Sequence, residues 1–557
     1  MTKYEKNHSQ GVNMNSYQNF YQNFNLQDLK NTFFGDFDSS INPAIECCDR
    51  YAHSDKIALY YEGLKGEKEA MSFARLKSRS NQIANFLTDQ GIKKGDTVAV
   101  MLPRTPELLA IIIGVWKLGA IYQPLFTAFG PQSIDKRLDS SHAKLLITDE
   151  VNRFKCAGLK NKPTIVTYNR KTVYQLDPND IDYFQTINKY PISFEPVPMN
   201  GDDIFVLLST SGTTGNPKPV GIPVKAMLAF KQYMDLAVDL RQEDRFWNLA
   251  DPGWAYGIYY SVIGPLVNGN ALFFYEGGFD AIEFVRVIDE YSITNIAGSP
   301  TAYRLLIGAG KEVWGSLKGK LRAVSSAGEP LNPEVIRFFK DELDVLIKDH
   351  YGQTELGMLV NNHHALEHHE KPGSMGHVMP GYKIAVLDDH GNEVSVNTPG
   401  ILAVDMENSP ILWFHGYHQV KTPAIKNGHY LTGDTVEMNE DGMVTYVGRN
   451  DDVITSSGYR IGPFDVESAL MEHPAVLEVA VVGKPDPERT EIVKAFIVLG
   501  KDFTPSAALK EELSLFVKKS LAAHAYPREI EFLNELPKTP SGKVQRYILR
   551  SQEKRAS

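Results

Sequence analysis

The chain has few cysteines and no long uncharged hydrophobic run. Only Cys47, Cys48 and Cys156 are present among 557 residues. Neighbouring cysteines are poorly placed to bond with each other, and an odd number leaves one over. We therefore expect no disulfide framework and a reducing, cytoplasmic compartment. The most apolar run, residues 108–122, contains Lys117 and is shorter than the roughly 20 residues that a membrane span needs. It predicts a buried helix packed on a sheet.

Positive charge is also scarce. The chain has 58 Lys and Arg against 68 Asp and Glu, a net charge of −10, so no basic surface for nucleic acid or an anionic membrane is expected. Residues 1–38 are rich in Asn, Gln, Tyr and Phe. They contain no apolar stretch typical of a secretory signal, and no arginine precedes Arg50, which argues against a mitochondrial transit peptide. We expect a polar leader that is poorly ordered or wrapped over the surface.

The pattern of the remaining chain predicts an α/β fold with a largely parallel sheet. Helix-like and strand-like segments alternate, and 557 residues exceed what one core usually serves. The strands are expected at residues 97–102, 204–208, 293–297 and 321–324, and a helix at 73–90. After residue 450 the character changes to a compact α+β domain, with strands at 475–482, 492–499 and 529–533 and a helix at 508–521. We predict domains at 39–450 and 451–557.

One loop is built to hold a polyphosphate. It follows the strand at 204–208 and combines hydroxyl side chains, two glycines and a lysine. Backbone N–H groups in a glycine-containing loop form a cavity for anions, the hydroxyls add donors, and the lysine adds positive charge. The Walker A spacing is absent. The residues expected to bind phosphate are Thr210, Ser211, Gly212, Thr213, Thr214, Gly215 and Lys218.

Further motifs occur in order at residues 325–330, 351–355, 430–434, 448–463 and 537–543. This ordered set resembles the adenylate-forming enzymes, which include acyl-CoA synthetases, luciferases and the adenylation domains of peptide synthetases. The resemblance is greatest to the medium-chain and acetyl-CoA synthetase-like branch. It implies a large multi-sheet N-terminal domain and a small mobile C-terminal lid that turns about Asp451. It also implies ATP, Mg²⁺ and CoA as reactants, with an acyl-adenylate formed first and a thioester second.

The resemblance assigns roles around the reacting phosphate. Lys543 is implied to be the lysine essential for adenylation but not for thioester formation, although a solvated lysine is the ordinary alternative. Thr354 would donate to the α-phosphate, and Glu355 would be an oxygen ligand of Mg²⁺. Asp434 and Arg449 would contact the ribose.

Other residues are assigned to the nucleotide and to CoA. Arg460 would contact phosphates or a partner loop, and Tyr351 would stack on adenine. Taken singly, Asp434 could cap a turn, Glu355 could begin a helix, Arg449 could form a surface ion pair, and Tyr351 could be ordinary core. The remaining assignments are Gly328, Glu329 and Pro330 for the adenine wall and Ser457 and Gly458 for CoA.

The acyl pocket is implied by residues 251–257, 327 and 352. Acetate-specialised relatives carry tryptophan at the position of Gly352, so a glycine is expected to leave the pocket floor open. A short- to medium-chain acid is therefore favoured. Tyr256 argues against long chains and suits branched or aromatic acids. The residues assigned to the acid are Trp254, Ala255, Tyr256, Gly257, Ala327 and Gly352.

A histidine cluster offers a competing interpretation. His364 and His368 would share one helical face, as zinc ligands require, and His363 and His369 lie beside them. No His-Glu-x-x-His pattern is present, so we interpret the segment as a polar loop or helix before Pro372.

Two other classes of protein remain as alternatives. One is another adenylating enzyme, such as an aromatic or branched acid–CoA ligase, a carrier-protein ligase or a luciferase. The other is a nucleotide-binding regulator without catalysis, against which Lys543, Thr354 and Glu355 argue. The position of Lys543 in its loop also leads us to expect a lysine acyltransferase and a deacylase as partners.

Overall fold

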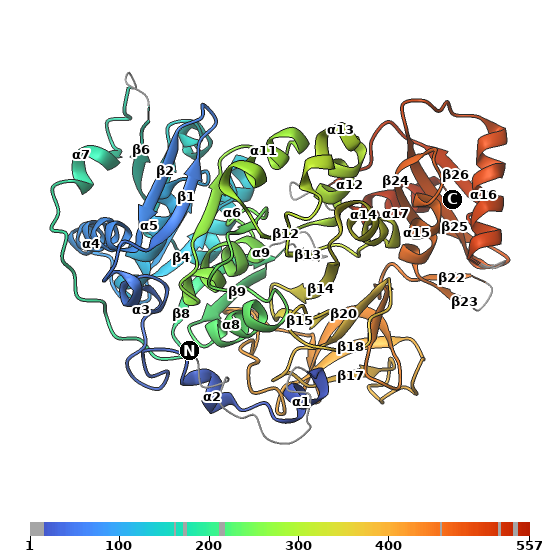
Figure 1. Ribbon diagram of the computed structural model, residues 1–557, viewed down its shortest axis with the longest axis horizontal. Helices are drawn as coiled ribbons and strands as arrows, with labels where there is room; N and C mark the ends of the chain where they lie inside the picture. The colour runs from blue at the N-terminus through green and yellow to red at the C-terminus, as the bar shows by residue number, and fades with distance from the viewer. Residues whose placement is uncertain are drawn as a thin grey trace.

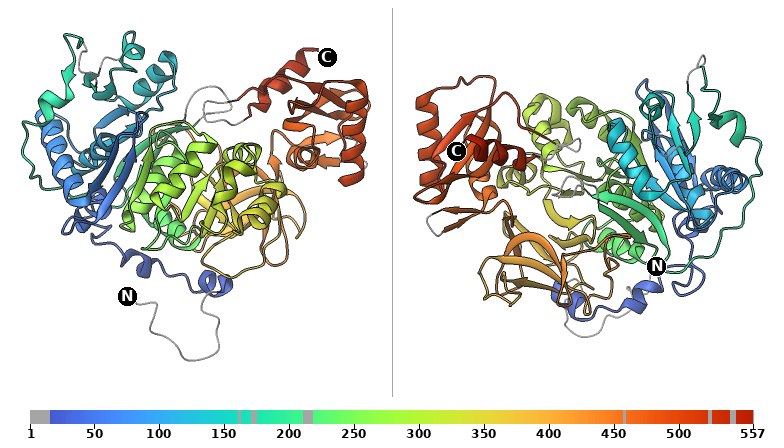
Figure 2. Two further views of the ribbon diagram at one scale, coloured as in Figure 1. Left: turned by 45° about the horizontal axis from the view of Figure 1, so that its top comes forward. Right: turned by 180° about the vertical axis from the view of Figure 1, so that it is seen from behind.

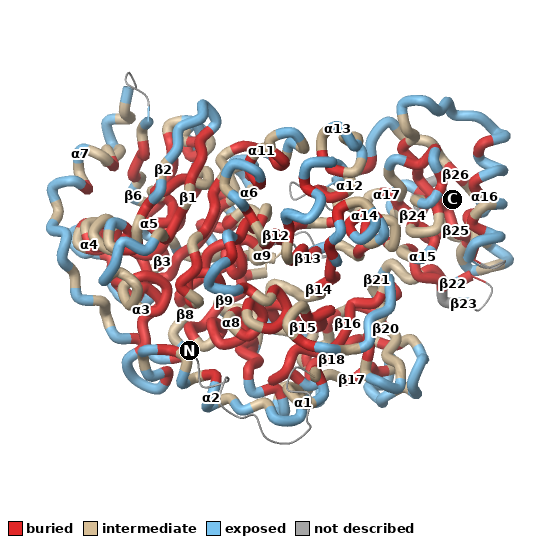
Figure 3. Tube along the Cα trace, viewed as in Figure 1, coloured by how far each residue is buried: buried red, intermediate tan, exposed pale blue. Residues whose placement is uncertain are grey.

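The computed structural model describes residues 16–160, 163–170, 175–210, 218–456, 459–521, 525–538 and 544–556. It confirms the α/β class, with a large N-terminal part of several sheets and a C-terminal domain at one end of the molecule (Figure 1). The interiors of the strands are buried, and the exposed residues lie mostly on loops and outer helix faces (Figure 3).

The first sheet is parallel except at one edge. Its strand order is β7-β6-β5-β3-β4-β8-β9, and only β9 runs antiparallel to its neighbour. The strands are β3 Thr97–Met101, β4 Ile121–Pro124, β5 Leu145–Asp149, β6 Thr164–Tyr168, β7 Ile181–Asp182, β8 Ile204–Thr210 and β9 Lys218–Pro223. A smaller sheet has the order β11-β1-β2, with β1 Ile57–Glu62, β2 Lys68–Ser72 and β11 Leu272–Tyr275.

The apolar run at 108–122 is only partly helical, which corrects the expected single helix. Helix α5 (Pro106–Lys117) packs on α4 (Phe73–Asp89) and ends before Gly119, whose φ is +69°. Ile121 then begins β4. The positive φ turns the chain back toward the sheet, which glycine permits at little steric cost. Lys117 is buried and is neutralised by Asp49, at 2.6 Å from its Nζ atom.

The second sheet is parallel in one half and antiparallel in the other. The parallel strands are β10 Phe246–Asn248, β12 Asn295–Gly298, β13 Ala323–Ala327 and β14 Ile347–Gln353. Helices α11 Ala281–Tyr291, α12 Pro300–Gly308 and α14 Pro333–Leu343 connect them. The antiparallel strands follow in the order β15 Gly357–Asn361, β16 Ser374–Val378, β21 Val444–Arg449, β20 His429–Met438, β18 Gly400–Asp405 and β17 Ile384–Leu387.

The expectation of a largely parallel sheet is therefore wrong for residues 357–449. No helix is found among the described residues between β14 and β21. Parallel neighbours need a crossover connection, usually a helix, whereas short turns join antiparallel strands.

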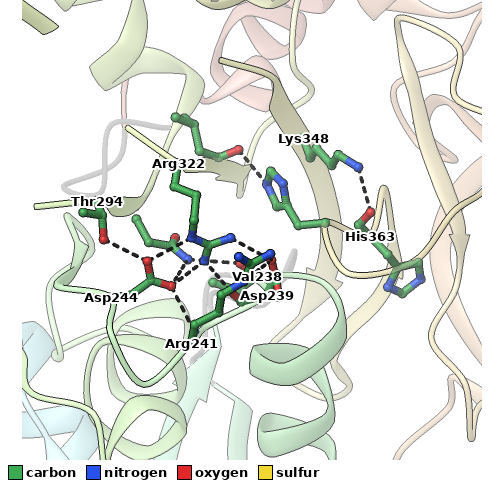
Figure 4. A network of polar contacts seen from close by, with 11 residues as sticks. Val238, Asp239, Arg241, Asp244, Thr294, Arg322, Lys348 and His363 are labelled. Carbon is green, nitrogen blue, oxygen red and sulfur yellow. Dashed lines mark hydrogen bonds and ion pairs between the residues drawn. The ribbon is translucent and has the colours of Figure 1, made fainter. Parts of the chain in front are cut away.

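The amino ends of the parallel strands are held by a polar network (Figure 4). Arg322, before β13, donates to Asp239 Oδ2 (2.7 Å) and to Asp244 Oδ1 (3.0 Å). Thr294, before β12, donates to the same Asp244 oxygen (2.8 Å). Because this end is filled by ion pairs, the opposite carboxyl ends are the available place for a ligand, as in other open α/β sheets.

The C-terminal domain has a sheet of order β23-β22-β25-β24, with β26 beside β25. Its strands are β22 Ile454–Ser456, β23 Tyr459–Ile461, β24 Val476–Asp486, β25 Thr490–Leu499 and β26 Glu529–Phe532. Its helices are α15 Pro463–Met471, α16 Ala507–Ser520 and α17 Arg546–Ala556. Val466, Val481, Val493 and Leu513 form a core of its own, so this part of the chain has the architecture of an independent α+β unit.

The described part of the N-terminal segment lies along the surface (Figure 2). Helices α1 (Tyr17–Gln22) and α2 (Leu26–Lys30) are short. The Tyr17 hydroxyl donates to the Val378 carbonyl (2.9 Å), and the buried Glu46 carboxylate accepts from the Phe34 and Gly35 N–H groups. The sequence left two possibilities for this leader, poorly ordered or wrapped over the surface. Residues 16–38 are wrapped over the surface.

Cys47, Cys48 and Cys156 are buried, and none forms a disulfide in this structure. Within the described ranges, we find no helix of the length and apolar character that crossing a membrane requires.

Candidate active site

Residues from β14, β20 and β21 converge on one buried carboxylate. Asp434 is 4% exposed. Its Oδ2 atom accepts from the Tyr351 hydroxyl (2.5 Å) and from Gln353 Nε2 (2.7 Å). Arg449 lies opposite it in the β20–β21 ladder, with 3.5 Å between Nη1 and Oδ1. Three residues singled out in the sequence, Tyr351, Asp434 and Arg449, are thus brought together from positions far apart in the chain.

Gln353 also contacts Asp434, although it was not among the residues predicted from the sequence. It also donates to the Thr432 carbonyl (2.9 Å) and accepts from the Tyr430 hydroxyl (3.1 Å). The signal was available, because side chains two residues apart on a strand share a face and Gln353 follows Tyr351 at that spacing. The hydroxyl of Tyr351 is anchored by Asp434, which fixes the position of its half-buried ring.

Thr354 and Glu355 follow directly after β14. The Thr354 carbonyl accepts from the Tyr259 hydroxyl (2.9 Å). Glu355 is 7% exposed and accepts from the Tyr417 hydroxyl (2.9 Å). Burial raises the pKa of Glu355, while the Tyr417 hydrogen bond and the Lys218 charge oppose that shift. Sequence inspection gave no local signal for Tyr259 or Tyr417, because both approach from distant segments.

The environment of Glu355 suits a hard cation. A carboxylate held in a buried place gains from a nearby positive charge, and Mg²⁺ prefers oxygen ligands shared with substrate phosphates. No group of three or more potential metal-ligating side chains occurs among the residues that the structure describes. Glu355 would therefore hold the ion together with phosphate oxygens.

The predicted phosphate loop is framed by a hairpin. Strands β8 and β9 pair as far as Thr210 and Lys218, which lie opposite each other. The Lys218 ammonium group lies 5.0 Å from the centre of the Tyr417 ring. The loop residues Ser211, Gly212, Thr213, Thr214 and Gly215 lie outside the described residues.

The expected adenine wall follows β13. Ala327 ends this strand, and Gly328 has a φ of +95° with open space where a Cβ atom would be. The Glu329 carboxylate is turned toward α12, where it accepts from Thr301 (2.9 Å) and Arg304 (3.2 Å). The backbone of Glu329 and Pro330 is therefore what an adenine base could contact at this edge of the sheet.

Gly352 lies where two strands approach closely, and its role as an open pocket floor stays a prediction. A Cβ atom at this position would lie 2.1 Å from the Gly357 carbonyl oxygen in the neighbouring strand. The β14–β15 ladder has an irregularity between Tyr351 and Gly352. Glycine is needed here because two backbones approach closely, and its missing side chain does not point into free space.

The other residues assigned to the acid surround a short helix. Trp254 packs against Phe126 and Phe129, with ring centroids 5.5 and 5.4 Å apart. Ala255 and Gly257 bound the helix α9 (Ala255–Gly257). The half-buried Tyr256 in its middle packs edge-on against Tyr260 (5.6 Å).

The predicted hinge residue Asp451 contacts Arg449, and the residues predicted for CoA lie outside the described part of the chain. Asp451 is 52% exposed and lies 3.6 Å from Arg449 and 3.7 Å from Arg550. The hairpin of β22 and β23, which carries Arg460, lies away from β14 and β20 in both directions of view (Figures 1 and 2). Ser457, Gly458 and Lys543 lie outside the described residues, as does the side chain of Arg460.

The histidine cluster is a loop that is buried at His363 and exposed at His369, and it forms no helix. His363 is fully buried, and its carbonyl accepts from Lys348 (2.7 Å; Figure 4). His368 accepts from the His363 N–H group (2.9 Å), and His364 contacts the Val324 carbonyl (3.0 Å). These contacts hold the loop against strands β13 and β14, and the helical face that zinc ligands would require is not formed.

The chain is similar to known proteins in sequence and in fold. The chain matches the AMP-binding enzyme family over residues 48–417 and the AMP-binding enzyme C-terminal domain over residues 465–543. It is 38% identical to an acetyl-coenzyme A synthetase from Bacillus subtilis (strain 168), covering 97% of this chain and 96% of that protein. It is 36% identical to 4-hydroxybutyrate–CoA ligase 1 from Metallosphaera sedula, covering 89% of this chain and 87% of that protein. A crystal structure of Brucella canis acyl-CoA synthetase is similar with a TM-score of 0.80 and 53% identity, covering 97% of this chain and 99% of that one.

The chain belongs to the AMP-binding enzyme family. It is an AMP-forming acyl-CoA synthetase, an acid–thiol ligase that uses ATP and Mg²⁺ and takes CoA as a substrate.

Proposed function

We propose that the enzyme activates a short- to medium-chain carboxylic acid at the group formed by Tyr351, Gln353, Asp434 and Arg449. The observation that carries this proposal is the convergence of these four residues beside Thr354 and Glu355. Asp434 and Arg449 would bind the ribose, and Tyr351 and the backbone at Gly328 would border adenine. Glu355 would hold Mg²⁺ against the phosphates.

The first half-reaction would join the acid to AMP. A carboxylate oxygen attacks the α-phosphorus, the bond to the β-phosphate bridging oxygen breaks, and pyrophosphate leaves. Donors already aimed at the developing charge are usually the largest contribution to such a step. In this role we place the Thr354 hydroxyl, the loop at 210–218 and Lys543.

The second half-reaction would use the C-terminal domain in a different orientation. The CoA sulfur attacks the acyl carbon, its proton is lost to solvent, and AMP leaves. The hairpin of β22 and β23 lies away from β14 in the arrangement of Figures 1 and 2. A rotation about Asp451, whose partners are Arg449 and Arg550, would bring it to the acyl-adenylate.

The direct test is pyrophosphate release with a panel of acids from acetate to octanoate, including branched and aromatic acids, with and without CoA. We expect acid-dependent release without CoA and complete turnover to acyl-CoA with it. Release that requires no added acid, or none with any acid, would contradict the proposal. A ligase for a carrier protein would release pyrophosphate but leave CoA unconsumed. The relatives named for acetate and 4-hydroxybutyrate support acids at the short end of this chain-length range.

A cytoplasmic location stays a prediction from the cysteine usage.

Removing the hydroxyl of Tyr417 tests the role of Glu355. Tyr417→Phe keeps the ring beneath Lys218 but removes the hydrogen bond that holds the pKa of Glu355 down. The pKa should rise further, so a smaller fraction of Glu355 is ionised at a given pH. We expect a higher KM for Mg²⁺, and the acid limb of the kcat/KM profile should move up by about one pH unit, as expected for the loss of one hydrogen bond to a charged group.

The matched control is Tyr190→Phe, which removes a hydroxyl bonded to Asp89 (2.6 Å) at a distant surface. Tyr190→Phe should leave both the KM for Mg²⁺ and the acid limb of the kcat/KM profile unchanged. A Tyr417→Phe enzyme that unfolds at a lower temperature but keeps its Mg²⁺ dependence and pH profile would assign Tyr417 a structural role only.

We further propose that acylation of Lys543 by an acyltransferase switches the enzyme off and that a deacylase restores it. Acylation removes the ammonium charge that the first half-reaction needs. Protein shown by mass spectrometry to be fully acylated at Lys543 should release little pyrophosphate and recover after deacylation. Full activity in the acylated protein would rule out this regulation.

A further inference from the structure

Asn332 lies at the N-cap position of helix α14 but does not cap it. Its backbone is extended (φ −71°, ψ 142°), as capping requires, yet its side chain bonds to none of the first N–H groups of the helix. Asn42 is the matched case, because it also precedes a proline at the start of a helix. There the Oδ1 atom accepts from the Ala44 N–H group (2.8 Å). The side chain of Asn332 is therefore diverted to other partners.

The two partners of Asn332 lie in different domains. Its Nδ2 atom donates to the Ser468 hydroxyl (3.1 Å) on α15 of the C-terminal domain. Its Oδ1 atom accepts from Arg304 (3.2 Å), whose guanidinium group also donates to Glu329 (3.2 Å) in the expected adenine wall. A chain of hydrogen bonds thus runs from Glu329 to the C-terminal domain. Asn332 itself is buried, so water competes little for these bonds.

Helix α15 connects this contact to the segment that contains Lys543. Glu467, the neighbour of Ser468, accepts from Arg546 (2.7 Å) at the start of α17. Arg546 follows Lys543 by three residues and also interacts electrostatically with Glu329. The orientation that Asn332 holds is therefore one in which the start of α17 faces the expected adenine wall, as the lysine-dependent first half-reaction requires.

The boundary between the domains is loosely packed beside this contact. A cavity of about 300 Å³ is lined by residues of both domains, among them Pro333, Phe464 and Ser468 itself. Another contact across the boundary, between Arg337 and Glu472 (3.4 Å), is an exposed ion pair of a kind that contributes little to stability. One shielded hydrogen bond is therefore enough to shift the balance between two orientations.

We propose that Asn332 is a positioning residue that holds the C-terminal domain in the orientation for the first half-reaction. When the domain rotates for the second half-reaction, the Asn332 side chain leaves Ser468 and turns back to cap α14. The cap replaces the lost hydrogen bond, so the two orientations stay close in free energy. The inference rests on the proposed function and adds a residue that controls the passage between its two steps.

Ser468→Ala removes the contact and leaves the capping side chain in place. In single-turnover experiments on the full-length enzyme, acid-dependent pyrophosphate release should slow by about three- to tenfold, the effect of losing one neutral hydrogen bond. Formation of acyl-CoA from bound acyl-adenylate should be unchanged or faster. The ratio of the two rates is the readout, because a merely structural defect lowers both together. Ser468→Thr keeps the hydroxyl and should restore the ratio.

Two substitutions of Asn332 test the alternation between contact and cap. Asn332→Ser keeps a good capping group but is too short to reach Ser468, so the ratio should change as in Ser468→Ala. Asn332→Ala removes one interaction from each orientation, so the ratio should return toward the wild-type value while the melting temperature falls. Asn42→Ala is the control for a lost cap, since it should lower the melting temperature and leave the ratio unchanged.

Three results would overturn the inference. One is an unchanged ratio in Ser468→Ala, and another is an equal loss of both half-reactions in that variant. The third is a ratio in Asn332→Ala that departs as far from the wild type as in Asn332→Ser, because the cap then plays no part. Failure of the proposed function is different, because then the wild-type enzyme releases no pyrophosphate with any acid.

Discussion

Replacing Lys543 by alanine is expected to lower acid-dependent pyrophosphate release by on the order of 10²-fold or more, the cost of removing a preorganised charge at the reacting phosphate. Thioester formation from preformed acyl-adenylate should largely survive, because negative charge no longer builds up on a transferring phosphate in that step. The two half-reactions are measured separately, as pyrophosphate release without CoA and as acyl-CoA formation from synthetic acyl-adenylate.

Lys538→Ala is the matched control, because it removes a lysine from the same segment. Lys538 forms an ion pair with Glu478 (2.7 Å) on the surface of the C-terminal domain, and exposed pairs contribute little to stability. Both half-reactions should persist in this variant. Equal loss of both half-reactions in Lys543→Ala would refute a role confined to adenylation.

A tryptophan at Gly352 is expected to impair the enzyme with every acid alike. The first carbon of any side chain would meet the Gly357 carbonyl oxygen at 2.1 Å, so the β14–β15 hairpin must move. Overpacking of this kind costs typically 1–3 kcal/mol and more for a large ring. The hairpin carries Tyr351 and Gln353, so its displacement disturbs the contacts to Asp434.

Gly352→Ala is the sharper variant, because one methyl group suffices for the clash. It should lower the melting temperature and reduce kcat/KM for acetate, butanoate and hexanoate by the same factor. Gly308→Ala, where a Cβ atom would meet nothing within 4 Å, should be neutral or slightly stabilising. A Gly352→Trp enzyme that stays folded and prefers acetate over longer acids would restore the interpretation of Gly352 as the determinant of chain length.

Gly352 shows what the sequence could not predict about the acyl pocket. This glycine is assigned to the acid-binding region from its motif alone, and that role stays a prediction. A sequence does not show which backbone lies across from a missing side chain, here the Gly357 carbonyl oxygen in the neighbouring strand.

The local elements of the fold were predictable where one pattern held over a whole element. Helix α4 and strands β3 and β26 lie within one or two residues of their expected bounds. The run at 108–122 was misjudged because its uniform apolar character fits both a buried helix and a buried strand, and periodicity cannot separate the two. Only Gly119, with its positive φ, marks the change.

The sequence by itself determined the family and the reaction. It could do so because backbone donors, hydroxyls and charges that bind phosphate must occur at fixed short spacings, and these spacings are visible along the chain. The tertiary structure alone decided that Tyr351, Gln353 and Arg449 meet at Asp434. It also decided that the Tyr417 hydroxyl donates to Glu355. These relations depend on pairing between distant strands and on burial, which come into being only when the sheets assemble.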